Sequence, residues 1–206
     1  MSARTLYAAL AGITLLLAAC EKRNEDAAFE MLQPPAAPAV LAKHWKLPEF
    51  ALTERSGETL RLSDLAGKVW VADFFYTTCP GPCPMLSSRL SDVQKALGDE
   101  PGVRLVSISV DPEKDTPEVL KKYAEAFKAN ERWLFFTGQK DAIYSLAREG
   151  FKLPIADAPS EGGLIIHTTR LILVDKEGVV RGFYEGGNET GVVDLIRDMR
   201  RLLDEA

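Results

Sequence analysis

The chain has 206 residues, of which 46% are hydrophobic and 27% are charged. This composition is typical of a soluble globular protein with one domain, a buried core and flanking segments. The net charge at pH 7 is −5 and the sequence has no run of Lys or Arg, which argues against nucleic acid as a partner.

The N-terminal segment, residues 1–19, is typical of a bacterial lipoprotein signal peptide. A single positive charge, Arg4, precedes the apolar run 5–19, which has the length of a signal-peptide core and is short for a membrane span. Small residues stand directly before Cys20, and a polar run follows it. We expect cleavage before Cys20 and acylation of this cysteine, which would anchor the mature chain to the membrane. An ordinary secretory signal and an uncleaved anchor are the alternatives.

Residues 20–43 are predicted to form a flexible tether between the lipid and a folded domain over residues 44–206. The segment is charged at first and then rich in Ala and Pro, a composition that favours a semi-extended linker. Loss of the signal peptide would leave one lipid-bearing cysteine and one pair of thiols. In an oxidising envelope compartment, such a pair either forms a disulfide or serves a chemistry that needs thiols.

The folded domain begins with a predicted hairpin, after which strands and helices alternate until a second hairpin and a last helix. Residues 68–76 are apolar, β-branched and aromatic, which favours a buried central strand. Pro84 and Pro117 suit the first turns of two helices, with Thr116 as the cap of the second. The first hairpin is expected at 50–62, further strands at 103–110, 132–138, 170–175 and 179–186, helices at 84–97, 117–127, 141–148 and 190–203, and a loop at 154–163. This order predicts an α/β fold with a mixed central sheet flanked by helices, and thioredoxin-like topology with an N-terminal hairpin extension fits it best.

The stretch FFYTTCPGPCPML places Cys79 just past the end of the predicted central strand and Cys83 where a helix begins. Ligands bind at the carboxyl ends of strands in open α/β sheets, and a helix N-terminus lowers the pKa of a nearby thiol. Three intervening residues, two of them proline, restrict the loop and can hold both sulfurs on one side. The spacing is compatible with a disulfide, a redox switch and a metal site, and does not choose among them.

The domain offers two histidines, His44 and His167. His167 precedes the predicted strand 170–175, which would pair near the central strand in a thioredoxin-like sheet. Two thiolates and one imidazole suit Cu(I), which prefers soft ligands and accepts a low coordination number, whereas zinc usually takes four protein ligands, or three and a water. A lone histidine is more often a structural or surface residue than a metal ligand. His44, next to the tether, is expected at the surface.

Three stretches together resemble the Sco/SenC family of copper chaperones: GKVWVADFFYTTCPGPCPML, VSISVDPEKDTPEVLKKYAEAF and HTTRLILVDKEG. The resemblance covers residues 45–204 and implies a thioredoxin-like fold. It also implies copper, as Cu(I) or Cu(II), bound by Cys79, Cys83 and His167. The implied function is that of a metallochaperone, which assists assembly of the copper A centre of cytochrome c oxidase by delivering copper, by reducing the cysteines of the target, or both. Any enzymatic activity would then be thiol–disulfide exchange.

The same resemblance implies that oxidation to a Cys79–Cys83 disulfide would release the metal. The implied partners are the copper-centre subunit of the oxidase or another cuproprotein, a thiol reductant of the envelope, and the membrane, reached through the lipid on Cys20. The protein is expected on the extracytoplasmic side of the cytoplasmic membrane. One departure concerns the loop, which in the family usually reads Cys-Pro-Asp-Val-Cys-Pro, because Gly81 and Pro82 leave it without an acidic residue.

Two other functions fit the pair. A lipid-anchored thiol–disulfide oxidoreductase would use the cysteines in exchange, although members that resemble thioredoxin use Cys-x2-Cys and place a proline where this chain has residues 167–169. A scaffold lipoprotein would hold the pair as a static structural disulfide, although the strand-end crevice gives no special reason for one. Near the loop, Met85 is expected to pack in the core, and Asp111, Glu113 and Asp115 to shape a turn and a helix start.

Overall fold

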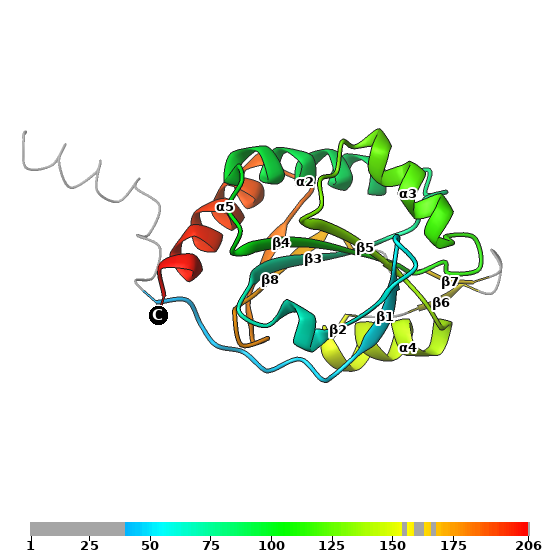
Figure 1. Ribbon diagram of the computed structural model, residues 1–206, viewed down its shortest axis with the longest axis horizontal. Helices are drawn as coiled ribbons and strands as arrows, with labels where there is room; N and C mark the ends of the chain where they lie inside the picture. The colour runs from blue at the N-terminus through cyan, green and yellow to red at the C-terminus, as the bar shows by residue number, and fades with distance from the viewer. Residues whose placement is uncertain (1–39, 154–155, 159–162, 166–167, 206) are drawn as a thin grey trace, which may run out of the picture. The chain divides into compact units, whose positions relative to one another are not determined.

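The computed structural model describes residues 40–153, 156–158, 163–165 and 168–205 (Figure 1). Residues from Leu41 to the C-terminus form one compact unit. The predicted signal peptide, Cys20, most of the predicted tether and His167 lie outside the described residues. Within those residues, no helix combines the length and the apolar character that crossing a membrane requires.

A mixed sheet of seven strands forms the centre of the compact unit. The strands are β1 (Ala51–Glu54), β2 (Thr59–Arg61), β3 (Val69–Phe75), β4 (Val103–Ser109), β5 (Trp133–Thr137), β8 (Arg170–Val174) and β9 (Val180–Glu185). They lie in the order β2-β1-β5-β4-β3-β8-β9. The middle strands β3, β4 and β5 are parallel, whereas β8 and β9 on one side and β1 and β2 on the other are antiparallel additions. The predicted mixed sheet and its N-terminal hairpin extension are therefore confirmed.

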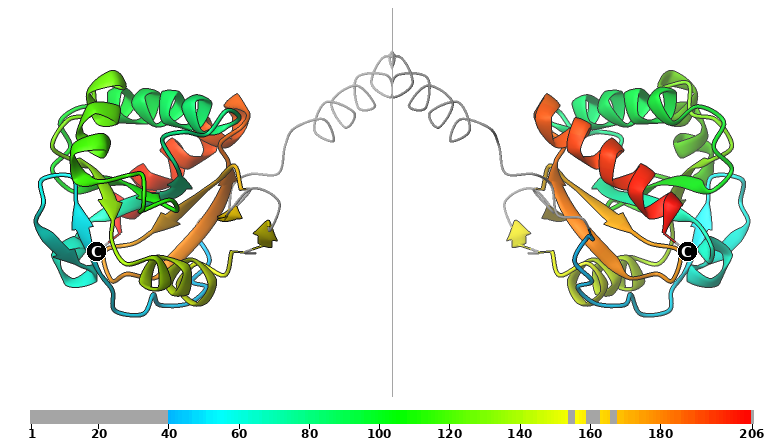
Figure 2. Two further views of the ribbon diagram at one scale, coloured as in Figure 1. Left: turned by 90° about the vertical axis from the view of Figure 1, so that its right-hand side faces the viewer. Right: turned by 90° about the vertical axis from the view of Figure 1, so that its left-hand side faces the viewer.

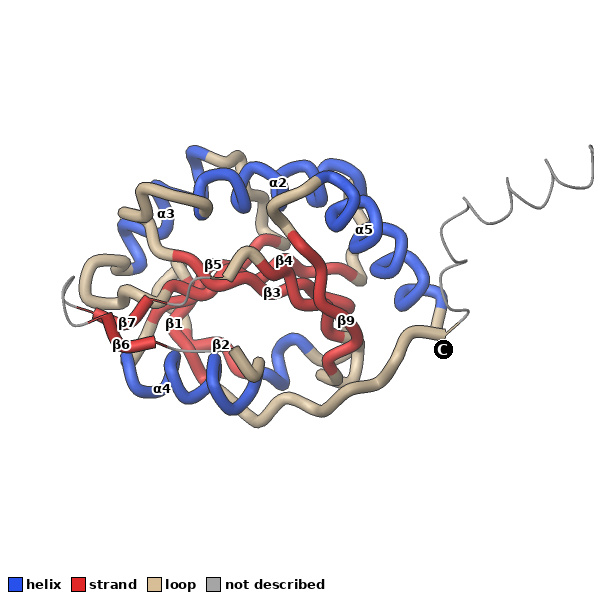
Figure 3. Tube along the Cα trace, turned by 180° about the vertical axis from the view of Figure 1, so that it is seen from behind, coloured by secondary structure: helices blue, strands red, loops and turns tan. Residues whose placement is uncertain are grey.

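Helices cover both faces of this sheet, as Figures 1, 2 and 3 show. One face carries α2 (Cys83–Leu97), α3 (Pro117–Ala126) and α5 (Glu189–Asp204), and the other carries the 3-10 helix η1 (Leu62–Leu65), α4 (Lys140–Ser145) and the π-helical turn η2 (Leu146–Gly150). Alternate residues of β3 point into two separate cores: Val71 and Phe75 into the first, and Trp70 and Phe74 into the second. Because strand side chains alternate between faces, a continuously apolar strand needs a helical layer on each side.

The structure differs from the sequence prediction at residues 154–163. That segment was expected to be a loop, but β6 (Ala156–Ala158) pairs with β7 (Gly163–Ile165) in a separate antiparallel two-stranded sheet. Each strand has three residues, which is too short for a period-two pattern to stand out in the sequence. The reason for the difference is therefore the length of these strands.

The side chain of Arg181, in β9, is buried and joins three segments of the compact unit. Its guanidinium donates hydrogen bonds to the carbonyl oxygens of Leu41 (2.9 Å) and Ala42 (3.0 Å). It also donates to the carboxylates of Asp175 (3.0 Å) and Glu205 (2.9 Å). These bonds hold the start of the compact unit against the β8–β9 turn and the end of α5, and they replace the hydration that the buried cation has lost.

Replacing Arg181 by methionine is expected to lower the free energy of unfolding by about 2 kcal/mol, because Asp175 would stay buried without its cation. The value lies below that for a fully enclosed ion pair because Glu205 is partly exposed. Arg170 provides a matched control, since its ion pair with Glu185 is exposed on both sides and its replacement by methionine should change little. Urea denaturation measures both variants, and equal stabilities would contradict the role given to Arg181.

Candidate metal and redox site

The cysteine loop (residues 76–82) connects the end of β3 to the start of α2. Cys79 lies in this loop, and Cys83 is the first residue of α2. Pro82 occupies the N-cap position and a second proline lies in the first helical turn, where a backbone N–H has no helical partner to lose. Within the loop, the backbone N–H of Cys79 donates to the carbonyl oxygen of Tyr76 at 3.2 Å. The strand, turn and helix thus place both cysteines at the carboxyl end of the central strand, as predicted.

Both thiols are free and largely buried. The exposed fraction is 9% for Cys79 and 6% for Cys83, and both lie in the core between α2 and the sheet, together with Leu86 and Phe75. Each thiol shifts the pKa of the other. The sulfurs are therefore neighbours, an arrangement that suits either a disulfide or a shared soft metal ion.

The two thiols differ in acidity. Burial raises the pKa of Cys79, but hydrogen bonds from the side chain and backbone of Cys83 and from the backbone of Gly81 outweigh it, and the pKa lies below that of an ordinary thiol. Burial and then the hydrogen bond with Cys79 raise the pKa of Cys83 to about 12. The expectation that the helix N-terminus favours a thiolate fails at Cys83, because burial outweighs the helix dipole there. The more acidic thiol is the one in the loop.

A brief pulse of iodoacetamide at pH 8 is expected to modify Cys79 at least about tenfold faster than Cys83 in the reduced protein, because the thiolate is the reacting form. Peptide mass spectrometry measures the two rates. The same pulse in concentrated urea serves as the control, since unfolding removes the burial that separates the two pKa values. Equal rates in the folded protein would contradict the assigned difference in acidity.

A buried carboxyl group lies on the same face of the sheet as the cysteine pair. Asp73, in β3, is 1% exposed, and its Oδ1 accepts a hydrogen bond from Ser107 Oγ of β4 at 2.6 Å. Ser107 Oγ in turn accepts one from Trp133 Nε1 at 2.9 Å. Among the described residues, Oδ2 of Asp73 has no hydrogen-bond partner. Burial raises the pKa of Asp73 to about 7 against the opposing bond from Ser107, and the charge on Asp73 contributes to the raised pKa of Cys83.

His44 and Met85 test two expectations about single residues. His44 is exposed, as predicted, with its ring 5.8 Å from that of Trp45 and 5.6 Å from that of Phe183 between centroids. Met85 is 38% exposed, so the prediction that it packs in the core is wrong. The buried face of α2 passes through the next residue, Leu86, and the helical period turns Met85 toward solvent beside the cysteine pair.

The acidic turn after β4 has the expected shape. The backbone N–H of Lys114 donates to the carbonyl oxygen of Asp111 at 3.1 Å. The carboxylates of Asp111 and Glu113 pair with Lys114 (3.0 Å) and Lys140 (3.2 Å), so surface lysines already hold these two acids. Asp115 belongs to the same turn but is fully buried, which the sequence did not indicate.

The two thiols are the metal-binding candidates in the described part of the chain. Across those residues, no group of three or more His, Cys, Asp or Glu side chains gathers as a metal site. The predicted third ligand, His167, lies outside the described residues. A pair of neighbouring soft sulfur donors fits Cu(I) and does not by itself complete a zinc site.

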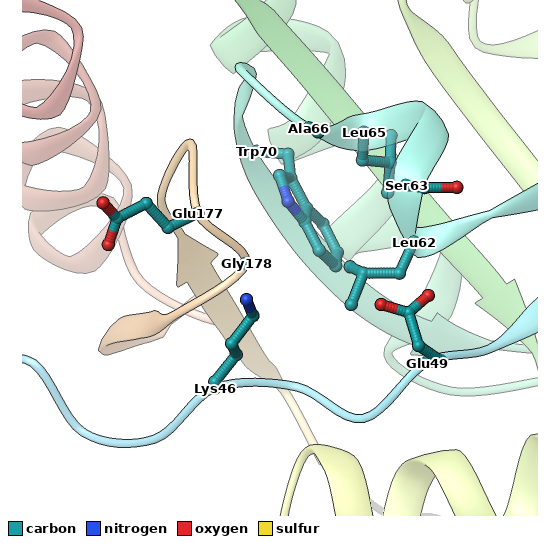
Figure 4. A pocket seen from close by; sticks show the side chains of 9 residues that line it. All are labelled: Lys46, Glu49, Leu62, Ser63, Leu65, Ala66, Trp70, Glu177 and Gly178. Carbon is teal, nitrogen blue, oxygen red and sulfur yellow. The ribbon is translucent and has the colours of Figure 1, made fainter.

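A cavity of about 230 Å³ lies at the other end of β3 (Figure 4). Trp70, near the start of that strand, forms one wall with Leu62 and Leu65 of η1. Glu49 lies next to Leu62, and Lys46 and Glu177 lie on the opposite side (Figure 4). Its lining contains neither a thiol nor an imidazole. Because the cysteine loop follows the opposite end of β3, this cavity is separate from the candidate metal site.

Comparison with known proteins connects this geometry to a family. The sequence profile described as SCO1/SenC matches residues 41–204. The crystal structure of a SCO1/SenC family lipoprotein from Bacillus anthracis is 37% identical, with a TM-score of 0.71, and the match covers 77% of this chain and 95% of that one.

Two further solved structures are similar. BsSco, a member of the Sco family of cytochrome c oxidase assembly proteins in which a disulfide switch was identified, is 31% identical, with a TM-score of 0.72 and coverage of 82% of this chain and all of that one. Bradyrhizobium japonicum ScoI with copper bound is 26% identical, with a TM-score of 0.66 and coverage of 77% and 99%. The chain has the thioredoxin-like fold and belongs to the SCO1/SenC family.

Proposed function

We propose that this protein is a copper metallochaperone of the bacterial cell envelope that assists assembly of the copper A centre of cytochrome c oxidase. The observation that carries the proposal is the pair of free, buried thiols, Cys79 and Cys83, at the strand end of a SCO1/SenC chain. Two relatives support it, since one has been solved with copper bound and another is an oxidase assembly protein.

Cys79 and Cys83 would bind copper as thiolates, with neutral His167 as the third ligand. Cys79 gives up its proton more readily than Cys83, so the Cys79 sulfur would bind copper first. Binding of Cys83 to the same ion would then displace the proton of that thiol. Soft donors favour Cu(I) over Cu(II). Because binding releases protons from both thiols, the affinity for copper should fall as pH drops.

Thiol exchange is the second function that an observation favours. The difference in acidity between the thiols suits a division of labour in which the Cys79 thiolate attacks a disulfide of the partner and Cys83 resolves the mixed disulfide. The partner's disulfide gains two electrons, and the pair is left as a Cys79–Cys83 disulfide. An envelope thiol reductant would then restore the pair, and the disulfide form would not hold copper.

The N-terminal segment would set the location of this chemistry. Cleavage of residues 1–19 and acylation of Cys20 would leave residues 44–206 as the folded domain on a tether of residues 20–43, at the extracytoplasmic side of the cytoplasmic membrane. The relative from B. anthracis is described as a lipoprotein, which supports the anchor. The target would be the copper-centre subunit of the oxidase or another cuproprotein.

Copper titration of the reduced full chain in detergent tests the proposal. The parent is expected to bind one equivalent of Cu(I), and His167→Ala to bind it about tenfold or more weakly and to alter the spectrum of the Cu(II) form. His44→Ala is the matched control, because it removes the other histidine of the folded domain. His44 is exposed and lies by the start of β9, where its backbone N–H, which the substitution keeps, donates to the carbonyl oxygen of Val180. A parent that binds no copper, but whose disulfide exchanges readily with small thiols, would favour a thiol–disulfide oxidoreductase instead.

A further inference from the structure

Asp115 is a buried carboxylate in the turn between β4 and α3. Its Oδ2 accepts hydrogen bonds from the backbone N–H of Thr77 (3.0 Å) and from Ser109 Oγ (2.5 Å), and its Oδ1 accepts one from Thr77 Oγ1 (2.5 Å). Within the described part of the chain, no Lys, Arg or His forms an ion pair with it. Three neutral donors, two from Thr77 and one from Ser109, thus replace the water that the buried carboxylate of Asp115 has lost.

The position of these donors connects Asp115 to the cysteine pair. Thr77 belongs to the cysteine loop, two residues before Cys79, and Ser109 is the last residue of β4. Ser109 Oγ also accepts a hydrogen bond from the backbone N–H of Asp111 at 3.1 Å. The carboxylate therefore fastens the cysteine loop to the end of the neighbouring strand and to the acidic turn that follows it.

Burying a carboxylate without a cation is costly, and a packed apolar side chain would avoid that cost. The turn itself does not need the buried carboxylate, because the backbone N–H groups of Lys114 and Asp115 already bond to the carbonyl oxygen of Asp111. What the carboxylate adds is the attachment of Thr77. In the described residues, the backbone N–H and the side-chain hydroxyl of Thr77 both donate hydrogen bonds to the carboxylate of Asp115.

We infer that Asp115 is a positioning residue that fixes the cysteine loop and so keeps Cys79 facing Cys83. The inference deepens the proposed function and rests on it only in taking this pair as the working site. Two thiols held in one geometry react with each other at a high effective concentration, and a looser loop lowers that concentration. Loss of the three bonds should therefore make the Cys79–Cys83 disulfide less favourable without removing either sulfur.

The test is the equilibrium constant for oxidation of the pair by oxidised dithiothreitol. In this exchange the two thiols lose two electrons and two protons to the reagent, and the protein gains one disulfide. It is measured on the full chain in detergent, with Cys20→Ala in every variant, under conditions where urea denaturation shows each variant to be folded. Asp115→Ala is expected to lower the constant by about tenfold.

Two further variants separate positioning from charge and from general destabilisation. Asp115→Asn keeps an acceptor for the Thr77 N–H and a donor for Thr77 Oγ1, so it should retain a constant close to that of the parent. Asp198→Ala removes another buried carboxylate, which is bonded to Tyr184 and Arg197 on the α5 side, and should lower stability while leaving the constant within about twofold. An unchanged constant in Asp115→Ala, or an equal loss in Asp115→Asn, would overturn the inference.

Adjacent threonines keep the inference testable if Asp115→Ala does not fold. Thr77→Val removes the Oγ1 bond to Asp115 and should lower the constant in part, whereas Thr78→Val alters an exposed neighbour and should not. Equal constants for these two variants would also count against the inference. Copper titration of the same samples judges the proposed function separately, since the disulfide equilibrium can be measured whether or not the parent binds copper.

Discussion

Replacing either Cys79 or Cys83 by serine is expected to lower the affinity for Cu(I) by at least about a hundredfold and to abolish stoichiometric binding. Serine keeps the shape of the side chain but offers a hard hydroxyl oxygen that stays protonated at neutral pH, and Cu(I) needs soft, deprotonated sulfur. The remaining thiol and the proposed ligand His167 form too small a ligand set to hold the metal in competition with small-molecule thiols.

The measurement is competition of each variant against a Cu(I) chelator of known affinity, with the thiols reduced. Cys20→Ser is the matched control, because it removes the third cysteine of the chain without touching the pair. The control should bind as tightly as the parent. Stoichiometric copper binding by both the Cys79 and Cys83 variants would show that the pair is not the metal site.

Replacing Asp73 by asparagine is expected to flatten the dependence of stability on pH between pH 5 and pH 8. Burial raises the pKa of Asp73 from 3.8 to about 7, so in this window the folded protein holds a proton that the unfolded chain has already released. The free energy of unfolding of the parent should therefore fall as pH rises, by roughly 3 kcal/mol from this group alone, and level off above the folded-state pKa. Asparagine cannot ionise and keeps an acceptor for Ser107.

Urea denaturation at pH 5, 6.5 and 8 measures this effect as the difference between the parent and the Asp73 variant. Asp92→Asn on α2 is the control, since Asp92 is half-exposed and its replacement should leave the slope of the parent unchanged. Asp198 and Glu118 have lowered pKa values and affect stability mainly below pH 5, where their protonation would remove stabilising hydrogen bonds. A slope as steep in the Asp73 variant as in the parent would contradict the raised pKa.

The elements around the cysteine pair were predictable because they depend on neighbours in the sequence. The apolar run of β3 indicates a buried central strand, and Pro84 marks the start of a helix whose apolar spacing runs on to Leu97. These signals place Cys79 and Cys83 at the strand end without any knowledge of distant residues. The family resemblance was readable for the same reason, since its three motifs are continuous stretches.

The acidity of the site was not predictable from the sequence. The helix start suggested a thiol of lowered pKa, but burial and the hydrogen bond with Cys79 raise the pKa of Cys83, the thiol in the helix, and Cys79 is the more acidic of the two. Asp73 stands in the sequence as one acid within an apolar run. Its isolation from water depends on Ser107 and Trp133, which lie far along the chain.

The surroundings of Asp115 and Met85 were also not predictable from the sequence. The sequence placed Asp115 correctly in a turn but gave no sign that its carboxylate is buried against Thr77, 38 residues earlier. Met85 looked like a core residue by composition, and only the phase of α2 against the sheet turns it outward.

The sequence by itself determined the order of the elements, the thioredoxin-like fold, the family and the position of the thiol pair, because periodicity, proline placement and motif spacing are local properties of the chain. Only the tertiary structure decided which thiol is acidic, which carboxyl groups are buried and what holds the cysteine loop. Those properties depend on desolvation and hydrogen bonds between segments that meet only when the sheet and its helices have packed.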